Sequence, residues 1–293
     1  MENSSLVLHP RTAEQIAQLT AMPSHAVMLV GPNGIGKTYL ATTAAARILG
    51  IDQQALAGYP YFMTLAPEGT SISIETIRTL QKFLQLKTVG KGEGIRRVVL
   101  VEHAEALTIE AQNAFLKILE EPPADTLILL TADNRRALLP TILSRVQLIS
   151  VHVPGEADVK AFFGNEANGD ATALSQAFFL SGGLPGLMHA LLNKDEAHPL
   201  TAGVAQAKAI LQKQSFERLA MVESLSKQKE AAGYVLEALL HIAQTGISGA
   251  TTKGDIARLK QWHHIMKVTH QAQQALLQNA NTKLTLTNLM LNL

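Results

Sequence analysis

The feature that most constrains the fold is a glycine-rich segment, GPNGIGKT at residues 31–38. The apolar run AVMLV (26–30) precedes it, and residues 37–49 have the composition of a helix that ends at Gly50. A strand, a glycine loop and a helix, in this order, form the context in which such a loop holds phosphate groups. The sequence therefore predicts a nucleotide-binding α/β domain.

The loop offers the groups that a nucleotide needs, so we expect ATP and Mg²⁺ as ligands. The glycines let the backbone curl so that its N–H groups converge on phosphate oxygens. Lys37 would reach the β- and γ-phosphates, and Thr38 would give its hydroxyl to Mg²⁺. The alternative is a glycine turn that only looks like such a loop. The expected nucleotide ligands are Gly31, Pro32, Asn33, Gly34, Ile35, Gly36, Lys37 and Thr38.

A second candidate feature is the segment VVLVEHAEAL at residues 98–107, an apolar run that ends in Glu102 and His103. Hydrolysis of a nucleotide needs one acid beside Mg²⁺ and a second acid that orients the attacking water. Glu102 is a candidate for the metal side, together with Thr38. His103 stands where the second acid is expected, and a neutral imidazole lacks a carboxylate's charge and its two oxygens. It is a weak catalytic candidate or a solvent-facing residue, and efficient hydrolysis by this chain alone is doubtful.

The order of apolar segments predicts a parallel sheet with helices on both faces, followed by a helical region. Further strands are expected at 61–67, 96–102, 126–132 and 146–153, with helices beginning after Ser73 and Thr108. Beyond Pro154 nearly every segment has a helical pattern, with a break near 246–255. The expected domains are a nucleotide-binding domain at 1–153, a small helical domain at 154–198 and a second helical domain at 199–293.

The segment NAFLKILEEPPADTLILLTADNRRALLPTILSR (113–145) resembles the AAA+ clamp-loader subunits of DNA replication. The stretch 24–38 resembles the first strand and loop of that family. The segment 60–84 is similar to the second strand and helix of bacterial delta-prime subunits of DNA polymerase III, and 279–293 to their closing helix. The resemblance implies an α/β AAA+ domain, a small helical lid and an all-α collar through which subunits oligomerise.

The resemblance also implies roles for single residues. Arg145 matches an arginine that the family projects into a neighbouring subunit's ATP site, where a guanidinium stabilises charge on the transferring phosphoryl group. Three motor features are altered: His103 replaces the second acid, Gly186 replaces an arginine of the lid, and the sensor position near Ala132 and Asp133 lacks the family's usual threonine. Val146 replaces the family's usual cysteine. A zinc module of many relatives is absent, so no zinc is expected.

These observations predict a subunit that helps to load a sliding clamp onto primer-template DNA together with the other clamp-loader subunits. One alternative is a hydrolysing motor subunit of the same loader, resembling gamma or tau, that uses Glu102. Another is an AAA+ adaptor ATPase outside replication. Either rival keeps the nucleotide loop, so the loop alone does not distinguish them.

Composition narrows the setting of the protein. There is no cysteine, which excludes disulfides and thiolate metal sites. No stretch approaches the roughly 20 apolar residues of a membrane span, and no export signal is visible at the N-terminus, so we expect a cytoplasmic protein without membrane contact. The net charge of +1 argues against a chain that coats nucleic acid. A basic group could line a DNA-facing channel or a solvated loop: Lys82, Lys87, Lys91, Arg96 and Arg97.

Overall fold

The computed structural model describes residues 7–88, 94–164, 167, 170–195, 198–278 and 280–293. The chain divides into two compact units, Met1–Pro154 and Gly155–Leu293. The first combines a sheet with helices, and the described part of the second is helical. The further division of the helical part into a lid and a collar at 198/199 stays a prediction.

The first unit is built on a parallel sheet of five strands in the order β2-β3-β4-β1-β5. The predicted strands are confirmed, although three are shorter than expected. Val30 of β1 lies opposite Ala132 of β4, and Val101 of β3 lies opposite Leu130. The carboxyl ends of β1, β3 and β4 therefore meet at one edge of the sheet. The strands are β1 (Ala26–Val30), β2 (Phe62–Leu65), β3 (Arg97–Val101), β4 (Thr126–Ala132) and β5 (Gln147–Ser150).

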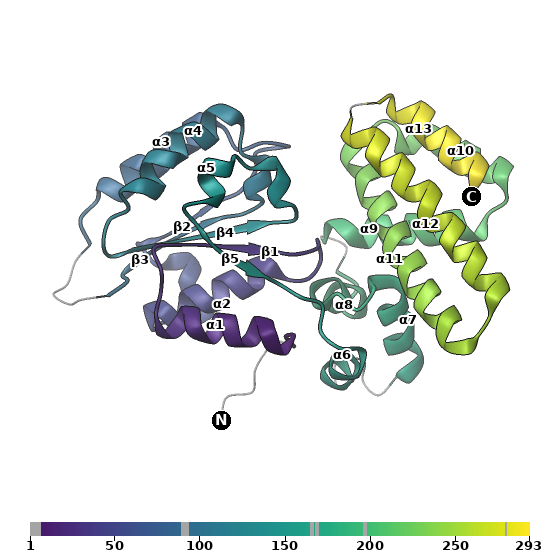
Figure 1. Ribbon diagram of the computed structural model, residues 1–293, viewed down its shortest axis with the longest axis horizontal. Coiled ribbons are helices and arrows are strands. Elements are labelled where there is room, and N and C mark those ends of the chain that lie inside the picture. Colours follow the sequence, from purple (N-terminus) through teal and green to yellow (C-terminus); the bar gives the residue numbers. More distant parts are fainter. Residues whose placement is uncertain (1–6, 89–93, 165–166, 168–169, 196–197, 279) are drawn as a thin grey trace. The chain divides into compact units, whose positions relative to one another are not determined.

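Helices cover both faces of this sheet, with α1 and α2 on one face and α3, α4 and α5 on the other (Figure 1). The expected caps are present, because the hydroxyls of Ser73 and Thr108 accept the N–H groups of Thr76 and Ala111. The helices are α1 (Pro10–Ala21), α2 (Lys37–Leu49), α3 (Ile74–Gln85), α4 (Ile109–Glu120) and α5 (Pro140–Leu143). Short 3-10 segments are η1 (Gln53–Gly58), η2 (Ala104–Ala106) and η3 (Arg135–Ala137).

One hydrophobic core cluster of the first unit lies between the sheet and the helices α3 to α5. Phe115 of α4 is fully buried there against strand residues such as Val99 and Ile128. Every residue of β3 and β4 is buried, as expected for strands of a parallel sheet that is covered on both faces. This packing fixes the strand ends from which the candidate site residues project.

The second unit consists of helices in its described residues, and none of the described helices of the chain is long and apolar enough to cross a membrane. The break expected within 246–255 occurs only at its end. Helix α11 continues to Lys253, and Gly254 (φ +67°) ends it. The helices are α6 (Glu156–Phe163), α7 (Ala171–Ser181), α8 (Pro185–Leu192), α9 (Pro199–Gln212), α10 (Ser215–Leu225), α11 (Lys229–Lys253), α12 (Ile256–Leu277) and α13 (Thr282–Asn292).

Gly246 lies inside helix α11, and its missing side chain makes room for an aromatic ring of α12. A Cβ atom at Gly246 would lie 2.5 Å from Cδ2 and Cε2 of Trp262 on α12. Phe179 of α7 meets the same indole edge to face, with 6.0 Å between ring centroids. A glycine inside a helix costs about 1 kcal/mol relative to alanine. The close packing of α11 against α12 and α7 offsets that cost, and the helix does not break.

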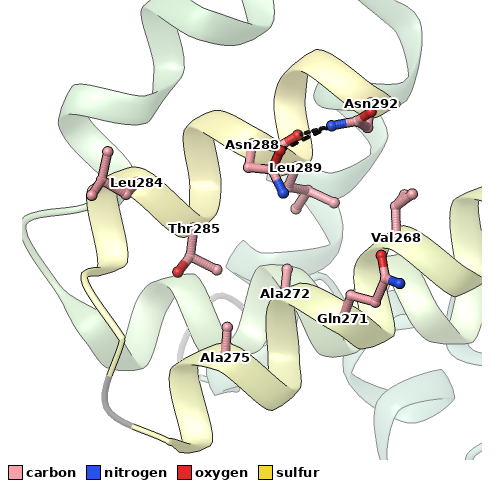
Figure 2. Close-up of a pocket in the computed structure, with 9 residues that line it drawn as sticks. All are labelled: Val268, Gln271, Ala272, Ala275, Leu284, Thr285, Asn288, Leu289 and Asn292. Atoms are coloured by element: carbon pink, nitrogen blue, oxygen red, sulfur yellow. Dashed lines mark hydrogen bonds between the residues drawn. The ribbon is translucent and has the colours of Figure 1, made fainter.

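The leucines near the C-terminus divide into two sets. Leu276, Leu286 and Leu289 are buried in the helical unit, whereas Leu277, Leu284 and Leu291 are exposed. A pocket of about 510 Å³ lies between α12 and α13, with Leu284 and Leu289 in its wall and Asn288 and Asn292 joined by hydrogen bonds beside it (Figure 2). Its lining residues are Val268, Gln271, Ala272, Ala275, Leu284, Thr285, Asn288, Leu289 and Asn292.

Candidate nucleotide-binding site

The glycine loop joins β1 to α2 at the carboxyl edge of the sheet. Gly34 (φ +80°) and Gly36 (φ +94°) adopt the left-handed conformation that other residues avoid, and α2 begins at Lys37. Gly31 has no room for a side chain, because a Cβ atom there would lie 2.7 Å from the carbonyl oxygen of Val151. The backbone path of the loop therefore requires these glycines.

Lys37 is almost completely buried, with 6% of its side chain exposed. Its ammonium donates to the carbonyl oxygens of Gly31 and Pro32, each at 3.0 Å. It also donates to Oδ1 of Asp133 at 2.5 Å. The lysine that would contact phosphate is thus folded back onto its own loop and onto an acid at the end of β4.

Asp133 belongs to a chain of polar contacts at the carboxyl ends of β3 and β4. Its backbone N–H donates to Oε1 of Glu105 at 3.1 Å, and Nδ1 of His103 lies 3.5 Å from the same oxygen. His103 has a left-handed backbone (φ +49°), and its N–H donates to the hydroxyl of Thr131 at 3.1 Å. Ligand atoms of His103, Glu105 and Asp133 all lie within 4.8 Å of one another. The sequence did not predict this assembly.

The environment shifts the protonation of these groups in different directions. The hydrogen bond to Glu105 raises the pKa of His103. Burial opposes ionisation of Glu105, but the bonds that it accepts from His103 and from the N–H of Asp133 together lower its pKa. Burial raises the pKa of Asp133, and the ammonium of Lys37 offsets part of that rise. Burial also raises the pKa of Glu102. The acids beside the loop therefore differ in how readily they carry charge.

The donor set fits a nucleotide with a divalent cation. The loop, the start of α2 and the ammonium of Lys37 are the groups that hold phosphates. The carboxylate of Glu102, at the end of β3, and the hydroxyl of Thr38 are oxygen ligands of the kind that Mg²⁺ prefers. Glu102 is half-buried, and its backbone N–H donates to the carbonyl of Leu65. Binding at these residues stays a prediction.

Arg145 lies between α5 and β5 and keeps 35% of its side chain exposed. Its Nη2 donates to Oε1 of Glu120 at 2.7 Å, and its Nη1 donates to the carbonyl of Thr141 and the hydroxyl of Ser144. These contacts bind the guanidinium to α4 and α5. The arginine is therefore held at the surface by an exposed carboxylate.

The structure does not support a DNA-facing channel that includes Arg97, one of the five basic residues considered for it. Arg97 is fully buried, donates to the carbonyls of Leu84 and Leu86, and stacks over the ring of Phe83 at 5.2 Å. It closes the C-terminal end of α3 and is not available to phosphates. Lys91 lies outside the described residues.

Sequence reasoning missed Asp133 and Glu105 as parts of the site. In the sequence, Asp133 only marked a position near which the family's usual threonine is missing, and no role was expected for Glu105. One signal was available for Asp133, since it directly follows an apolar strand of a parallel sheet, where functional side chains gather. Glu105 gave no comparable signal, because the turn η2 that brings it back toward β4 is not visible in the sequence.

Residues 11–154 match the family model described as "DNA polymerase III, delta subunit". A protein of Pseudomonas aeruginosa named DNA polymerase III subunit delta' is 37% identical over 183 residues, which cover 56% of this chain and 55% of that protein. Its namesake in Escherichia coli is 34% identical over 139 residues, covering 47% of this chain and 41% of that protein. The chain thus matches about half the length of these curated relatives or less.

Among solved structures, a "DNA polymerase III, gamma subunit-related protein" from Thermotoga maritima has the same fold, with a TM-score of 0.55. The similarity covers 94% of this chain and 97% of that one at 21% sequence identity. It therefore extends through both units, and it concerns the fold alone. The expected architecture, an α/β domain with a parallel sheet followed by helical segments, is confirmed.

Proposed function

From the match of residues 11–154 to the DNA polymerase III delta subunit family model, we propose that this chain is a delta-prime subunit of a replicative clamp loader. It binds ATP and supplies Arg145 to a neighbouring subunit, so that the assembly loads a sliding clamp onto primed DNA. The observation that carries this proposal is the match of residues 11–154 to this family model, because that segment holds the glycine loop, Glu102 after β3, and Arg145. The similarity to delta-prime relatives supports it.

In this proposal the glycine loop, Gly31 to Thr38, holds the phosphates of ATP, with Thr38 and Glu102 on the side of Mg²⁺. A bound Mg²⁺ ion neutralises charge on the phosphate oxygens. The chain's own turnover is weak, since His103 offers no carboxylate to orient water and instead faces Glu105. In this proposal the bound nucleotide stabilises the conformation of the subunit and is hydrolysed slowly, if at all.

Arg145 acts on the ATP of its neighbour. Its ion pair with Glu120 is exposed, and pairs of this kind contribute only about 0.2–1 kcal/mol. A transferring phosphoryl group in a water-poor interface is a much stronger partner for a planar guanidinium. The arginine can therefore leave Glu120 at small cost when a neighbouring site is presented.

The partners of this subunit are the other clamp-loader subunits, the sliding clamp and primer-template DNA, all in the cytoplasm. The exposed leucines of α12 and α13, Leu277, Leu284 and Leu291, support an oligomeric role for the helical unit. An apolar side chain on the surface of a helix can be covered by a helix of a partner.

A hydrolysing motor subunit is the second candidate, and the complete glycine loop with its buried lysine favours it. The two candidates differ in which variant is damaging. We expect Arg145→Ala to reduce ATP turnover of the reconstituted loader, with clamp and primed DNA present, far more than Lys37→Ala does. The matched control is Arg78→Ala, because Arg78 is another exposed arginine paired with a carboxylate, at 3.0 Å from Glu75.

Each outcome identifies one role. Loss of turnover in Lys37→Ala with little effect of Arg145→Ala assigns the chain to the motor class. If Arg145→Ala and Arg78→Ala change ATP turnover equally, Arg145 does not act on the ATP of a neighbouring subunit. A purified chain that never joins other loader subunits contradicts the clamp-loader proposal and favours an AAA+ adaptor outside replication.

A further inference from the structure

The ammonium of Lys37 has no donor left for a ligand. A lysine carries three N–H donors, and the three recorded acceptors are the carbonyls of Gly31 and Pro32 and the carboxylate of Asp133. With 6% of the side chain exposed, the group is also closed off from water. A phosphate oxygen can reach Lys37 only if one of these acceptors gives way.

Asp133 is the acceptor that resembles a phosphate oxygen, because it is the only one of the three that carries charge. It follows β4, whose last residue, Ala132, lies opposite Val30 of β1. The N–H of Gly31 donates to the carbonyl of Ala132 at 3.2 Å, which fixes the start of the loop beside Asp133. The register of β1 and β4 therefore places the carboxylate of Asp133 beside Lys37, the residue that would contact the phosphates.

Asp133 is also held from behind. Its N–H is bound by Glu105, whose carboxylate lies 3.5 Å from the imidazole of His103. Two carboxylates in one partly buried cluster would repel an incoming phosphate, because like charges repel. Asp133 therefore lowers the affinity for a nucleotide in two ways. It occupies the ammonium of Lys37, and its negative charge repels phosphate.

We propose that Asp133 is an internal competitor of nucleotide phosphate for Lys37, and that it lowers the affinity of the loop for ATP until the Lys37–Asp133 ion pair opens. The inference rests on the proposed nucleotide-binding role of the loop. Asp133 would then control how readily the loop binds ATP. For ATP to bind, a phosphate oxygen must replace the carboxylate of Asp133 on the ammonium of Lys37.

The test is isothermal titration calorimetry of the full chain with Mg²⁺ and ATP. Asp133→Asn keeps the shape and the backbone N–H but removes the charge, and we expect it to bind ATP at least ~10-fold more tightly, since hydrogen bonds to charged groups are the strong ones. The control is Asp52→Asn, which removes an exposed carboxylate from the same unit and retains the cap on the N–H of Gln54. It should match the wild type.

A double variant shows whether the effect passes through Lys37. In the Lys37→Ala background, Asp133→Asn should change the affinity for ATP by less than ~3-fold, because the contested ammonium is gone. If Asp133→Asn does not fold, as judged by its circular dichroism and melting transition, Asp133→Thr removes the charge and offers a hydroxyl oxygen in place of the carboxylate.

Three results would overturn the inference. Equal affinity of Asp133→Asn and the wild type for ATP refutes competition while leaving the nucleotide loop in place. Weaker binding in Asp133→Asn with Mg²⁺, but unchanged binding of ATP with a chelator, makes Asp133 a metal ligand instead. Absence of ATP binding in every variant refutes the proposed nucleotide binding together with the inference.

Discussion

Replacing Gly31 by alanine tests the geometry of the loop without touching a charged group. The added methyl carbon would lie 2.7 Å from the carbonyl oxygen of Val151 and 3.1 Å from its Cβ atom. Both atoms belong to the segment that directly follows β5, and a backbone oxygen has no rotamer by which to move away. The loop or the strand end must therefore shift, and with it the carbonyl of Gly31 that accepts from Lys37.

Two opposing effects set the size of the change. Overpacking at a closed position costs about 1–3 kcal/mol. Alanine also restricts the unfolded chain relative to glycine, which stabilises the folded state by about 0.4–1 kcal/mol where no strain arises. Gly58→Ala isolates this second effect, because nothing lies within 4 Å of a Cβ atom there. The difference in unfolding free energy between the two variants should be about 1–3 kcal/mol.

Differential scanning calorimetry of the full chain gives this difference. In a unit of this size, 1 kcal/mol moves the midpoint by about 2–4 °C, so Gly31→Ala should melt several degrees below Gly58→Ala. Titration with ATP should show weaker binding for Gly31→Ala alone. If the two variants melt together and bind ATP equally, the loop tolerates a methyl group at this position, and the close approach to Val151 does not constrain it.

Three further predictions concern other parts of the molecule. Gly246→Ala should lower the unfolding free energy of the helical unit by about 1–3 kcal/mol relative to Gly249→Ala in the same helix, as measured by thermal circular dichroism, because only the former meets an indole ring; equal melting would contradict the packing. Glu120→Gln should change loader turnover by at most about fivefold, since the exposed pair contributes no more than about 1 kcal/mol, whereas Arg145→Ala should nearly abolish turnover at the served site; a collapse in Glu120→Gln would give that acid another role. Burial lowers the pKa of His198, which caps α9 as a neutral acceptor, so its contribution to stability is full above pH 6.5 and is lost as pH falls through the folded pKa; His198→Asn should remove this part of the acid sensitivity in urea unfolding at several pH values.

The strands were predictable because their apolar runs are bounded by polar or glycine residues. Helix α2 was found with its bounds, since the loop and Gly50 mark both ends. Helix α1 was missed, because only a few of its residues are apolar. The continuation of α11 through Gly246 was missed for another reason, since a glycine that admits a facing ring looks, in sequence, like a glycine that ends a helix.

Only those site residues could be predicted whose position follows from the local sequence around them. The loop residues and Glu102 were named because each follows its own apolar strand. The contact between Lys37 and Asp133 depends on β4 lying next to β1, a sheet order that no local pattern encodes. Likewise, the partner of Arg145 depends on how α4 and α5 pack, so Glu120 could not be named in advance.

The aromatic residue packed on Gly246 is the only tryptophan of the chain. Three of the four tyrosines, Tyr39, Tyr59 and Tyr61, lie in the first unit, which holds the glycine loop. Intrinsic fluorescence excited selectively at the indole therefore reports on the helical unit alone. An emission change when ATP is added would reveal that a signal has crossed from one unit to the other, with no label attached to the protein.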